Sequence, residues 1–343
     1  MILLLVAQIT LSSALSCKDM NGNAVDWFSL IKPPKSDITN QGQNIMYLDP
    51  LSRTASIHPT LINNQNAISF TINQLNNKTV SSFIFNDQPP IPIPKSRKNR
   101  RQKKHKFETF NSAHAKGIIA YDKTSAFYIM HSFPLYPNIT STGIINTTIS
   151  YSQLIYGQNM ICITLTNTQL FNLAGVMSLI QPSVYYKNIL IENANITNII
   201  NNVLPNFGPS GSYDFTLGGF SLTYIAKNQF AGIQLWDDVV SKYFKQDIEV
   251  ESWGRPYILS VCPPNNIYHI LNIAGLQIQN IAWIKTQDHS KWGILMAMKT
   301  ICYGDMNRMT SQASRGGGAL CLELDWLFTL HNDIITDVDP CGT

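Results

Sequence analysis

Two short motifs of the same form stand far apart in the chain. His114-Ala-Lys116 recurs as His289-Ser-Lys291, and a short apolar run follows each copy. Residues i and i+2 of a strand project from the same face, so each motif sets an imidazole beside an ammonium group. An imidazole can attack phosphorus or donate a proton, and an ammonium group can bind the non-bridging oxygens of a phosphate. Two copies therefore carry the groups that metal-free cleavage of a phosphodiester needs.

A polar residue follows each motif at a similar offset. His131 comes 17 residues after His114, and Asn307 comes 18 residues after His289. This long-range repeat predicts two related halves that share one site. A single His-x-Lys arises easily by chance, so the alternative is that these residues are surface or core residues. Asn307 is predicted either to bind a phosphate oxygen or to cap a turn.

The remaining polar candidates indicate neither a metal nor a cofactor. His58, His269 and His331 have no carboxylate or cysteine at metal-ligand spacing and are predicted to be structural or exposed. The run Gly316–Gly318 favours a tight turn over a phosphate cradle.

Several short segments rich in β-branched and aromatic residues predict strands, and a few have the spacing of apolar residues that is typical of helices. The predicted strands span residues 117–122, 126–131, 159–166, 220–225, 248–253, 257–261 and 291–296, and the predicted helices span 169–180, 235–244 and 321–334. This mixture predicts an α+β protein of the α/β-sandwich type with a large sheet.

The positive charge of the chain is concentrated in one segment. The 343 residues carry a formal net charge of +4, and eight of the 25 basic residues lie between Lys95 and Lys106. The other residues include 17 basic and 21 acidic side chains, so an even basic coat for nucleic acid is absent. Prolines open the segment 89–106, which we predict to be an exposed loop. Its Arg97, Lys98, Arg100 and Arg101 are candidates for binding phosphates, with a solvated loop or a proteolytic site as the alternatives.

The chain has features of an exported protein. Residues 1–16 read as a signal peptide, with an N-terminal membrane anchor as the alternative, and no other stretch is long and apolar enough to span a bilayer. Six cysteines without Cys-x-x-Cys spacing favour disulfides over zinc, and 15 pairings are open. Glycosylation sequons occur at Asn77, Asn138, Asn146 and Asn195. We expect a secreted or lysosomal protein that has no membrane partner.

Ordered segments along nearly the whole mature chain match the pattern of a known family. They are Cys17–Gly22, Val25–Phe28, Lys32, Met46–Asp49, Phe85–Pro90, His114–Gly117, His131–Pro134, Tyr156–Gln158, Asp288–Trp292, Gly304–Arg308 and Arg315–Gly318. Through these segments the chain resembles deoxyribonuclease II. In the first motif Ala115 departs from the usual Thr, and Gly293 stands where relatives can carry a Cys.

The resemblance implies a fold, an activity and a site. It implies a phospholipase D-like fold in which two halves, each a β-sheet flanked by helices, lie about a pseudo-twofold axis, here approximately residues 17–170 and 171–343. The implied activity is metal-independent hydrolysis of double-stranded DNA at acid pH, which leaves 3′-phosphates. The implied catalytic residues are His114, Lys116, His131, His289 and Lys291, and the implied disulfides are Cys17–Cys162, Cys262–Cys341 and Cys302–Cys321.

Two other classes of function compete with the nuclease. A catalytically silent secreted paralogue that binds DNA or a host molecule is the main alternative, and retention of all five site residue types favours the enzyme. A phospholipid hydrolase is disfavoured by the family-specific segments. DNA is the predicted partner, and a homodimer is compatible with the sequence.

Overall fold

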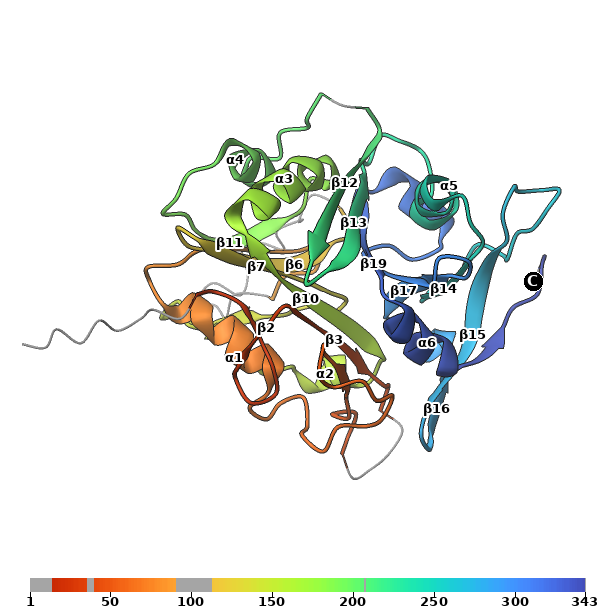
Figure 1. The fold of residues 1–343 in the computed structure, drawn as a ribbon, viewed down its shortest axis with the longest axis horizontal. Coiled ribbons are helices and arrows are strands. Elements are labelled where there is room, and N and C mark those ends of the chain that lie inside the picture. Colours follow the sequence, from red (N-terminus) through yellow and green to blue (C-terminus); the bar gives the residue numbers. More distant parts are fainter. Residues whose placement is uncertain (1–13, 36–39, 91–112, 207, 343) are drawn as a thin grey trace, which may run out of the picture.

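The computed structural model describes residues 14–35, 40–90, 113–206 and 208–342, and two large β-sheets form its framework (Figure 1). The first sheet has the strand order β11 (Val184–Asn188), β5 (Ser81–Asn86), β6 (Lys116–Tyr121), β7 (Ser125–His131), β10 (Gln158–Thr166), β3 (Trp27–Lys32) and β4 (Met46–Leu48). The second has the order β12 (Ser210–Leu217), β13 (Phe220–Lys227), β19 (Gly317–Glu323), β18 (Thr300–Gly304), β17 (Lys291–Leu295), β14 (Ile248–Ser252), β15 (Ile270–Ile278) and β16 (Ile281–Ile284), and β20 (Ile335–Val338) also pairs with β15. Within these sheets only β14 and β15 pair in parallel.

Strand β6 shows why these segments form central strands. Alternate side chains of a strand project to opposite faces. Ile119 and Tyr121 enter the core between the sheets, whereas Ile118 and Ala120 enter a second core on the outer face of the first sheet. A strand that is buried on both faces needs a continuous apolar run, which is what the sequence supplies.

The two sheets meet through a shared core. Tyr128 of β7 contacts Tyr224 of β13 with ring centroids 6.4 Å apart. The hydroxyl groups of Ser29 in β3 and Tyr303 in β18 are hydrogen bonded at 2.6 Å. This core fixes one sheet against the other, so residues at neighbouring strand ends of the two sheets have defined relative positions.

Short helices cover and flank the sheets (Figure 1). Helix α3 begins with a capping box between Thr166 and Gln169, and its apolar side chains enter the core between the sheets. The helices are α1 (Ala67–Asn73), α2 (Tyr151–Leu154), α3 (Asn167–Met177), α4 (Ala194–Ile200), α5 (Ser241–Phe244), which continues the π-helix Leu235–Val240, and α6 (Asp325–Asp333). Two small hairpins pair β1 (Cys17–Lys18) with β2 (Ala24–Val25) and β8 (Asn138–Ile139) with β9 (Ile145–Asn146).

The predicted α+β class is confirmed, and three local predictions are wrong. Residues 257–261 form no strand, because Ile258 bonds to the carbonyl of Arg308 and only Val261 bridges to Ile270. The predicted helix 321–334 begins only at Asp325, because residues 321–323 extend β19. The glycines at 316–318 form no turn: the last two begin β19.

The disulfides match the pairing that the resemblance implies. Cys17 is bonded to Cys162, Cys262 to Cys341, and Cys302 to Cys321. Among the described residues no helix is long and apolar enough to cross a membrane. In chain order, the last strand of the first sheet spans 184–188 and the first strand of the second sheet spans 210–217. The chain therefore passes from one sheet to the other after residue 188, later than the approximate boundary of the halves at residue 170. The proposed signal peptide lies largely outside the described residues, although Leu15 is packed in the outer core of the first sheet.

Candidate active site

Both His-x-Lys motifs occupy the same position relative to a strand. Lys116 is the first residue of β6 and Lys291 is the first residue of β17, and each histidine lies two residues earlier. His131 ends β7, one residue beyond the pairing of Met130 with Gly117. Each lysine therefore lies at the N-terminal end of a central strand, and each histidine lies in the loop just before that strand.

The charges of the two motifs act on each other. Burial and the nearby Lys116 lower the pKa of Lys291 to about 7, against the opposing effect of buried carboxylates. Burial, Lys116 and Lys291 together lower the pKa of His131 to about 3. The structure thus brings both lysines and His131 into one electrostatic neighbourhood, although the motifs come from different sheets.

Asn159 links the two motifs through the backbone. Its side-chain oxygen accepts a hydrogen bond from the backbone N–H of Lys291 at 3.0 Å. Its carbonyl accepts from the N–H of Ser132, the residue after His131, also at 3.0 Å. One residue at the start of β10 in the first sheet therefore holds the start of β17 in the second.

His114 lies beside a carboxylate that also binds two cations. Its Nδ1 is 2.7 Å from Oε1 of Gln312, and its Nε2 is 3.9 Å from Oδ2 of Asp87. The same carboxylate bonds to Lys116 at 2.5 Å and to Arg315 at 2.9 Å. Because an amide oxygen only accepts, Nδ1 of His114 carries the hydrogen and Nε2 is available for proton transfer.

The pKa of His114 reflects these opposing neighbours. Burial and the positive charges of Lys116 and Lys291 hold it well below the usual 6.5, while Asp87 acts in the opposite direction. Burial acts to raise the pKa of Asp87 itself, but the neighbouring Lys116, His114 and Arg315 outweigh burial and lower it. In the free site burial and the lysine charges therefore favour the neutral form of His114, while the carboxylate of Asp87 favours the charged form.

His289 has a different environment, made of aromatic rings. The Tyr156 ring stacks on it with centroids 4.2 Å apart, and the Trp253 ring lies edge-on at 5.4 Å. Burial and the charge of Lys291 lower its pKa to about 3. The imidazole is neutral and restrained in orientation, as a nucleophile at acid pH needs to be.

Asp305, directly after β18, is a site residue that the motif analysis missed. It is buried, and its Oδ2 accepts from the N–H of Gly318 at 2.9 Å. Burial raises its pKa to about 7, although Lys116 and Lys291 both favour the ionised form. Below pH 7 it is therefore largely a neutral carboxyl group, which does not cancel the charge of the two lysines that act on it.

The signal for the missed residues was present in the sequence. Asp87, Asp305 and Arg315 all fall inside segments that carry the family resemblance. Gln312 lies between two of those segments, Gly304–Arg308 and Arg315–Gly318, and carries no signal of its own. Asp122, the acidic residue nearest to the first motif in sequence, instead caps a turn through Thr124 and Ser125.

The remaining predicted site residues are placed less directly. Neither ring nitrogen of His131 has a hydrogen-bond partner among the described residues, and the ring packs against Tyr136. Asn307 is buried, and its amide contacts the sulfur of Met309 at 3.7 Å. That contact does not join it to either motif. The candidate phosphate ligands Arg97, Lys98, Arg100 and Arg101 lie outside the described residues.

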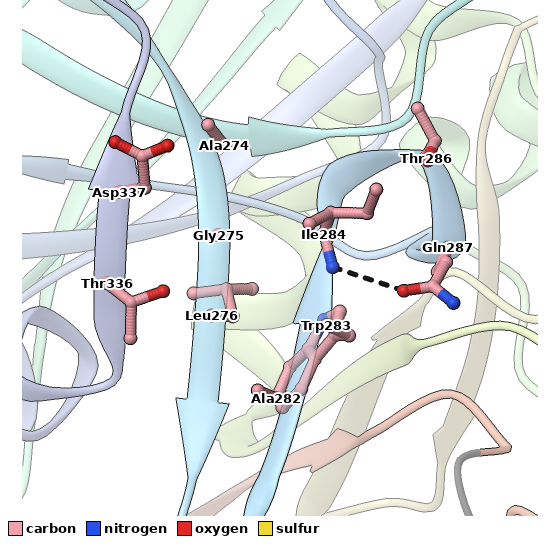
Figure 2. A pocket seen from close by; sticks show the side chains of 10 residues that line it. All are labelled: Ala274, Gly275, Leu276, Ala282, Trp283, Ile284, Thr286, Gln287, Thr336 and Asp337. Atoms are coloured by element: carbon pink, nitrogen blue, oxygen red, sulfur yellow. Dashed lines mark hydrogen bonds between the residues drawn. The ribbon is translucent and has the colours of Figure 1, made fainter.

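Two further features of the described residues were candidates for a ligand site, and neither involves the two motifs. A shallow pocket lies between β15, β16 and β20 and is lined by residues such as Trp283, Gln287 and Asp337, none of them from the two motifs (Figure 2). Among the described residues, the one grouping of potential metal ligands joins His269 to Cys262 and Cys341. Those cysteines are bonded to each other, so they offer no thiolate to a metal.

Comparison with known proteins assigns the chain over nearly its whole length. The profile of the family Deoxyribonuclease II matches residues 16–341. The chain is 30% identical to Deoxyribonuclease-2 of Caenorhabditis elegans, across 98% of this chain and 96% of that protein. It is 28% identical to Cell-death-related nuclease 7 of the same organism, across 95% and 88% of the two chains. It is 26% identical to Deoxyribonuclease-2-alpha of Sus scrofa, across 95% and 91%.

Proposed function

We propose, from the premise that the chain belongs to the deoxyribonuclease II family, that it is a metal-independent endonuclease that hydrolyses double-stranded DNA at acid pH and leaves 3′-phosphates. Family membership makes it a nuclease of the hydrolase class. The mechanism, the products and the independence from metal are the proposal. Its catalytic residues are His114, Lys116, His131, His289 and Lys291.

The observation that carries the proposal is that two His-x-Lys motifs from two sheets lie near each other. Lys116 lowers the pKa of Lys291 and of His289, and Lys291 lowers the pKa of His114. Two buried ammonium groups held this close repel each other unless an anion lies between them. A phosphodiester supplies that negative charge, and the two lysines supply the positive charge that a metal ion provides in other nucleases.

The geometry supports a two-step reaction. His114 takes up a proton at Nε2 when the bound phosphodiester offsets the lysine charges. His289 then attacks phosphorus, the bond from phosphorus to the 5′ oxygen breaks, and His114 gives its Nε2 proton to that oxygen. Water then attacks the phosphohistidine, His114 takes the proton from that water, and the bond to His289 breaks to release the 3′-phosphate. Lys116 and Lys291 bind the non-bridging oxygens in both steps, and Asp305 in its protonated form leaves their charge available.

The strand order supports the pseudo-twofold arrangement of the halves. Read outward from the motifs, the first sheet runs β6-β7-β10-β3-β4 and the second runs β17-β18-β19-β13-β12. On the other side of the motif strands lie β5 and β14, both antiparallel to them. The next pairs differ, because β5–β11 is antiparallel and β14–β15 is parallel. We infer that the two sheets are versions of one unit whose symmetry places the motifs at a common site.

We propose that the protein acts outside the cytosol, either secreted or in the lysosome. Three disulfides support this, because such bonds persist in oxidising compartments. Whether the basic segment 89–106 adds to DNA binding, and whether the chain forms a homodimer, stay predictions.

Plasmid digestion at pH 5 in EDTA tests the proposal. We expect the wild-type protein to nick and linearise the plasmid, and the product ends to accept a 5′ label directly but to resist 3′ extension until a phosphatase removes the 3′-phosphate. Lys116→Met and Lys291→Met should be inactive, whereas Lys242→Met, at a surface lysine paired with Asp238, should be unaffected. Activity that disappears in EDTA and returns with magnesium would overturn the mechanism. Binding of DNA without cleavage would favour the catalytically silent alternative.

A further inference from the structure

Two lysines outside the catalytic motifs occupy matching places in the two sheets. Lys32 ends β3 and pairs with Gln158, the first residue of β10. Lys227 ends β13 and pairs with Gly317, the first residue of β19. Both side chains are fully buried. A buried lysine is costly unless its charge is compensated, so two of them at equivalent positions call for a physical reason.

Each of these ammonium groups is bound by three backbone carbonyls. Lys32 donates to Pro33, Gly42 and Leu154 at 2.9, 3.1 and 2.8 Å. Lys227 donates to Gln312 and Ala313 at 3.1 and 3.0 Å, and to Arg315 at 2.5 Å. Neither forms an ion pair with a described residue. All three donors of each lysine are therefore used. Lys227 binds three carbonyls of one loop, whereas Lys32 joins the carbonyl of Leu154 to those of Pro33 and Gly42.

Each of these loops binds the histidine that belongs to the other sheet. Residues 154–157 lead into β10 of the first sheet, and the carbonyl of Gly157 accepts from the N–H of His289 at 2.9 Å. Residues 312–316 lead into β19 of the second sheet, and the carbonyl of Gly316 accepts from the N–H of His114 at 2.8 Å. Each sheet thus holds the histidine that precedes a strand of the other sheet.

A side chain of each loop also contacts the imidazole that the loop holds. Tyr156 stacks on the ring of His289, and Gln312 bonds to Nδ1 of His114. We refer to residues 154–157 with Lys32 as the first clasp, and to residues 312–316 with Lys227 as the second clasp. Each clasp sets both the backbone position and the ring orientation of one histidine.

We propose that Lys32 and Lys227 are positioning residues, with Lys32 holding His289 through the first clasp and Lys227 holding His114 through the second. This inference rests on the proposed nuclease function, because it explains how two imidazoles from different sheets are aligned on one phosphate. Misplacement of a reacting group by about 1 Å costs a reaction on the order of a hundredfold.

The state of the two lysines at acid pH fits this role. Burial lowers the pKa of Lys32 to about 7, with Asp288 acting in the opposite direction. Burial lowers the pKa of Lys227 to about 8, with Asp238 acting in the opposite direction. Both groups are therefore protonated at pH 5 and have all three donors for the loop carbonyls.

The test is NMR of the imidazoles in Lys32→Met and Lys227→Met. Protein labelled with ¹⁵N and ¹³C in histidine is compared with wild type at pH 5, and His114→Gln and His289→Gln assign the two signals. We expect Lys32→Met to shift the signal of His289 and leave that of His114, and Lys227→Met to do the reverse. Each variant should lose ~10–100-fold in single-turnover cleavage while its affinity for DNA is unchanged. Lys242→Met, at an exposed lysine, is the control and should match wild type.

The crossed pattern separates positioning from general damage. Variants in which both signals move alike, or neither moves, would overturn the proposal. If a Met variant does not fold, Lys32→Gln and Lys227→Gln, which keep two donors each, give the same comparison with smaller shifts. The crossed pattern in a protein that fails to cleave DNA would refute the nuclease and leave the clasps standing. Cleavage of DNA without the crossed pattern would refute the clasps and leave the nuclease function standing.

Discussion

At the scale of single residues, the two histidines that we propose to be catalytic lie in different environments, which suit different roles. Nε2 of His114 lies 3.9 Å from a carboxylate oxygen of Asp87, which stabilises its charged form. His289 lies between the rings of Tyr156 and Trp253, and no carboxylate raises its pKa. The carboxylate beside His114 suits a group that must carry a proton. The aromatic surroundings of His289 suit a nucleophile that must stay neutral. We therefore assign His114 as the acid and His289 as the nucleophile.

This assignment predicts the effect of Asp87→Asn. Without the carboxylate the pKa of His114 falls further, so the fraction that can donate a proton falls at every pH. We expect kcat at pH 5 to drop ~10–100-fold and the alkaline limb of the kcat profile to move to lower pH. Asp238→Asn, at a carboxylate paired with Lys242, serves as the control. An unchanged profile in Asp87→Asn would separate this carboxylate from the proton transfer.

The lowered histidine pKa values predict a second pH effect. In the free protein, burial and the lysine charges disfavour imidazolium at both His114 and His289. A bound phosphodiester offsets the lysine charges, so the pKa of His114 should rise when DNA binds. We expect the alkaline-limb pKa from kcat to exceed the one from kcat/KM, measured between pH 4 and pH 8 in EDTA. Equal values from both profiles would mean that the substrate does not tune the acid.

The sequence alone predicted the groups that we propose to do chemistry, but not those that set their charge. The spacing of the two motifs indicated which imidazoles and lysines belong together. Asp87 and Asp305 act through proximity in space, and neither stands at a spacing from the motifs that indicates a role. The lowered pKa of His131 could not be predicted from the sequence either, because burial beside two lysines is a property of the assembled sheets.

At the scale of secondary structure elements, the loops before β10 and β19 decide where the histidines lie. Gly157 and Gly316 each precede a strand by one residue and approach another segment closely. A Cβ at Gly157 would lie 2.4 Å from Oδ1 of Asp288, and one at Gly316 would lie 2.1 Å from the carbonyl oxygen of Ile180. Both contacts are shorter than a carbon atom allows, so each loop has to move if its glycine is replaced.

We therefore expect Gly157→Ala and Gly316→Ala to lower single-turnover cleavage by about a hundredfold, with a smaller loss of DNA affinity. Gly175→Ala is a matched control within α3, where the new methyl group would meet only the side chain of Asn195 at 3.1 Å. Rapid-quench cleavage and fluorescence-based DNA binding give the two quantities. Full activity in both glycine variants would mean that the loops do not position the histidines.

Helices and strands were predicted correctly where the residues of the segment itself decide its structure. The strands at the motifs and helix α3 follow from continuous apolar runs and from a capping box. The predictions over 257–261 and 321–334 were wrong because distant partners decide those segments. Cys321 is held in β19 between β13 and β18, which no local pattern reveals.

At the scale of the whole molecule, the fold puts two similar sheets against one core and leaves their motif ends in contact. The sequence predicted two related halves from the two motifs. That relation stays a proposal, and its support is the strand order around β6 and β17. The contact between the sheets could not be predicted, because pairs such as Tyr128 with Tyr224 and Ser29 with Tyr303 carry no mutual signal in one sequence.

Buried neutral histidines make the stability of the whole protein depend on pH. Burial lowers the pKa of His331 to about 4, although its bond to the Leu327 carbonyl acts in the opposite direction. The unfolded chain binds a proton near pH 6.5. The contribution of His331 is therefore fully present above that pH and is lost as the pH falls towards about 4, at ~1.4 kcal/mol per pH unit.

Replacing His331 should therefore flatten the dependence of stability on pH. Between pH 6.5 and pH 5, we expect the free energy of unfolding of His331→Gln to fall by ~2 kcal/mol less than that of wild type, measured by urea titration with the disulfides intact. His269→Gln, at an exposed ring paired with Asp247, should follow the wild-type slope. A slope in His331→Gln equal to that of wild type would mean that this ring is already charged in the folded protein.

The central claim is that one phosphodiester is cleaved by two histidines from two halves, and the leaving group tests it most directly. Thymidine 3′-(4-nitrophenyl) phosphate releases nitrophenolate, which needs no proton, whereas DNA releases an alkoxide that does. At pH 5 in EDTA we expect His114→Ala to release nitrophenolate within about tenfold of the wild-type rate but to lose DNA cleavage by ~10²–10⁴-fold. His289→Ala should lose both reactions. Substantial DNA cleavage by both variants would show that the site lies elsewhere and would contradict the account.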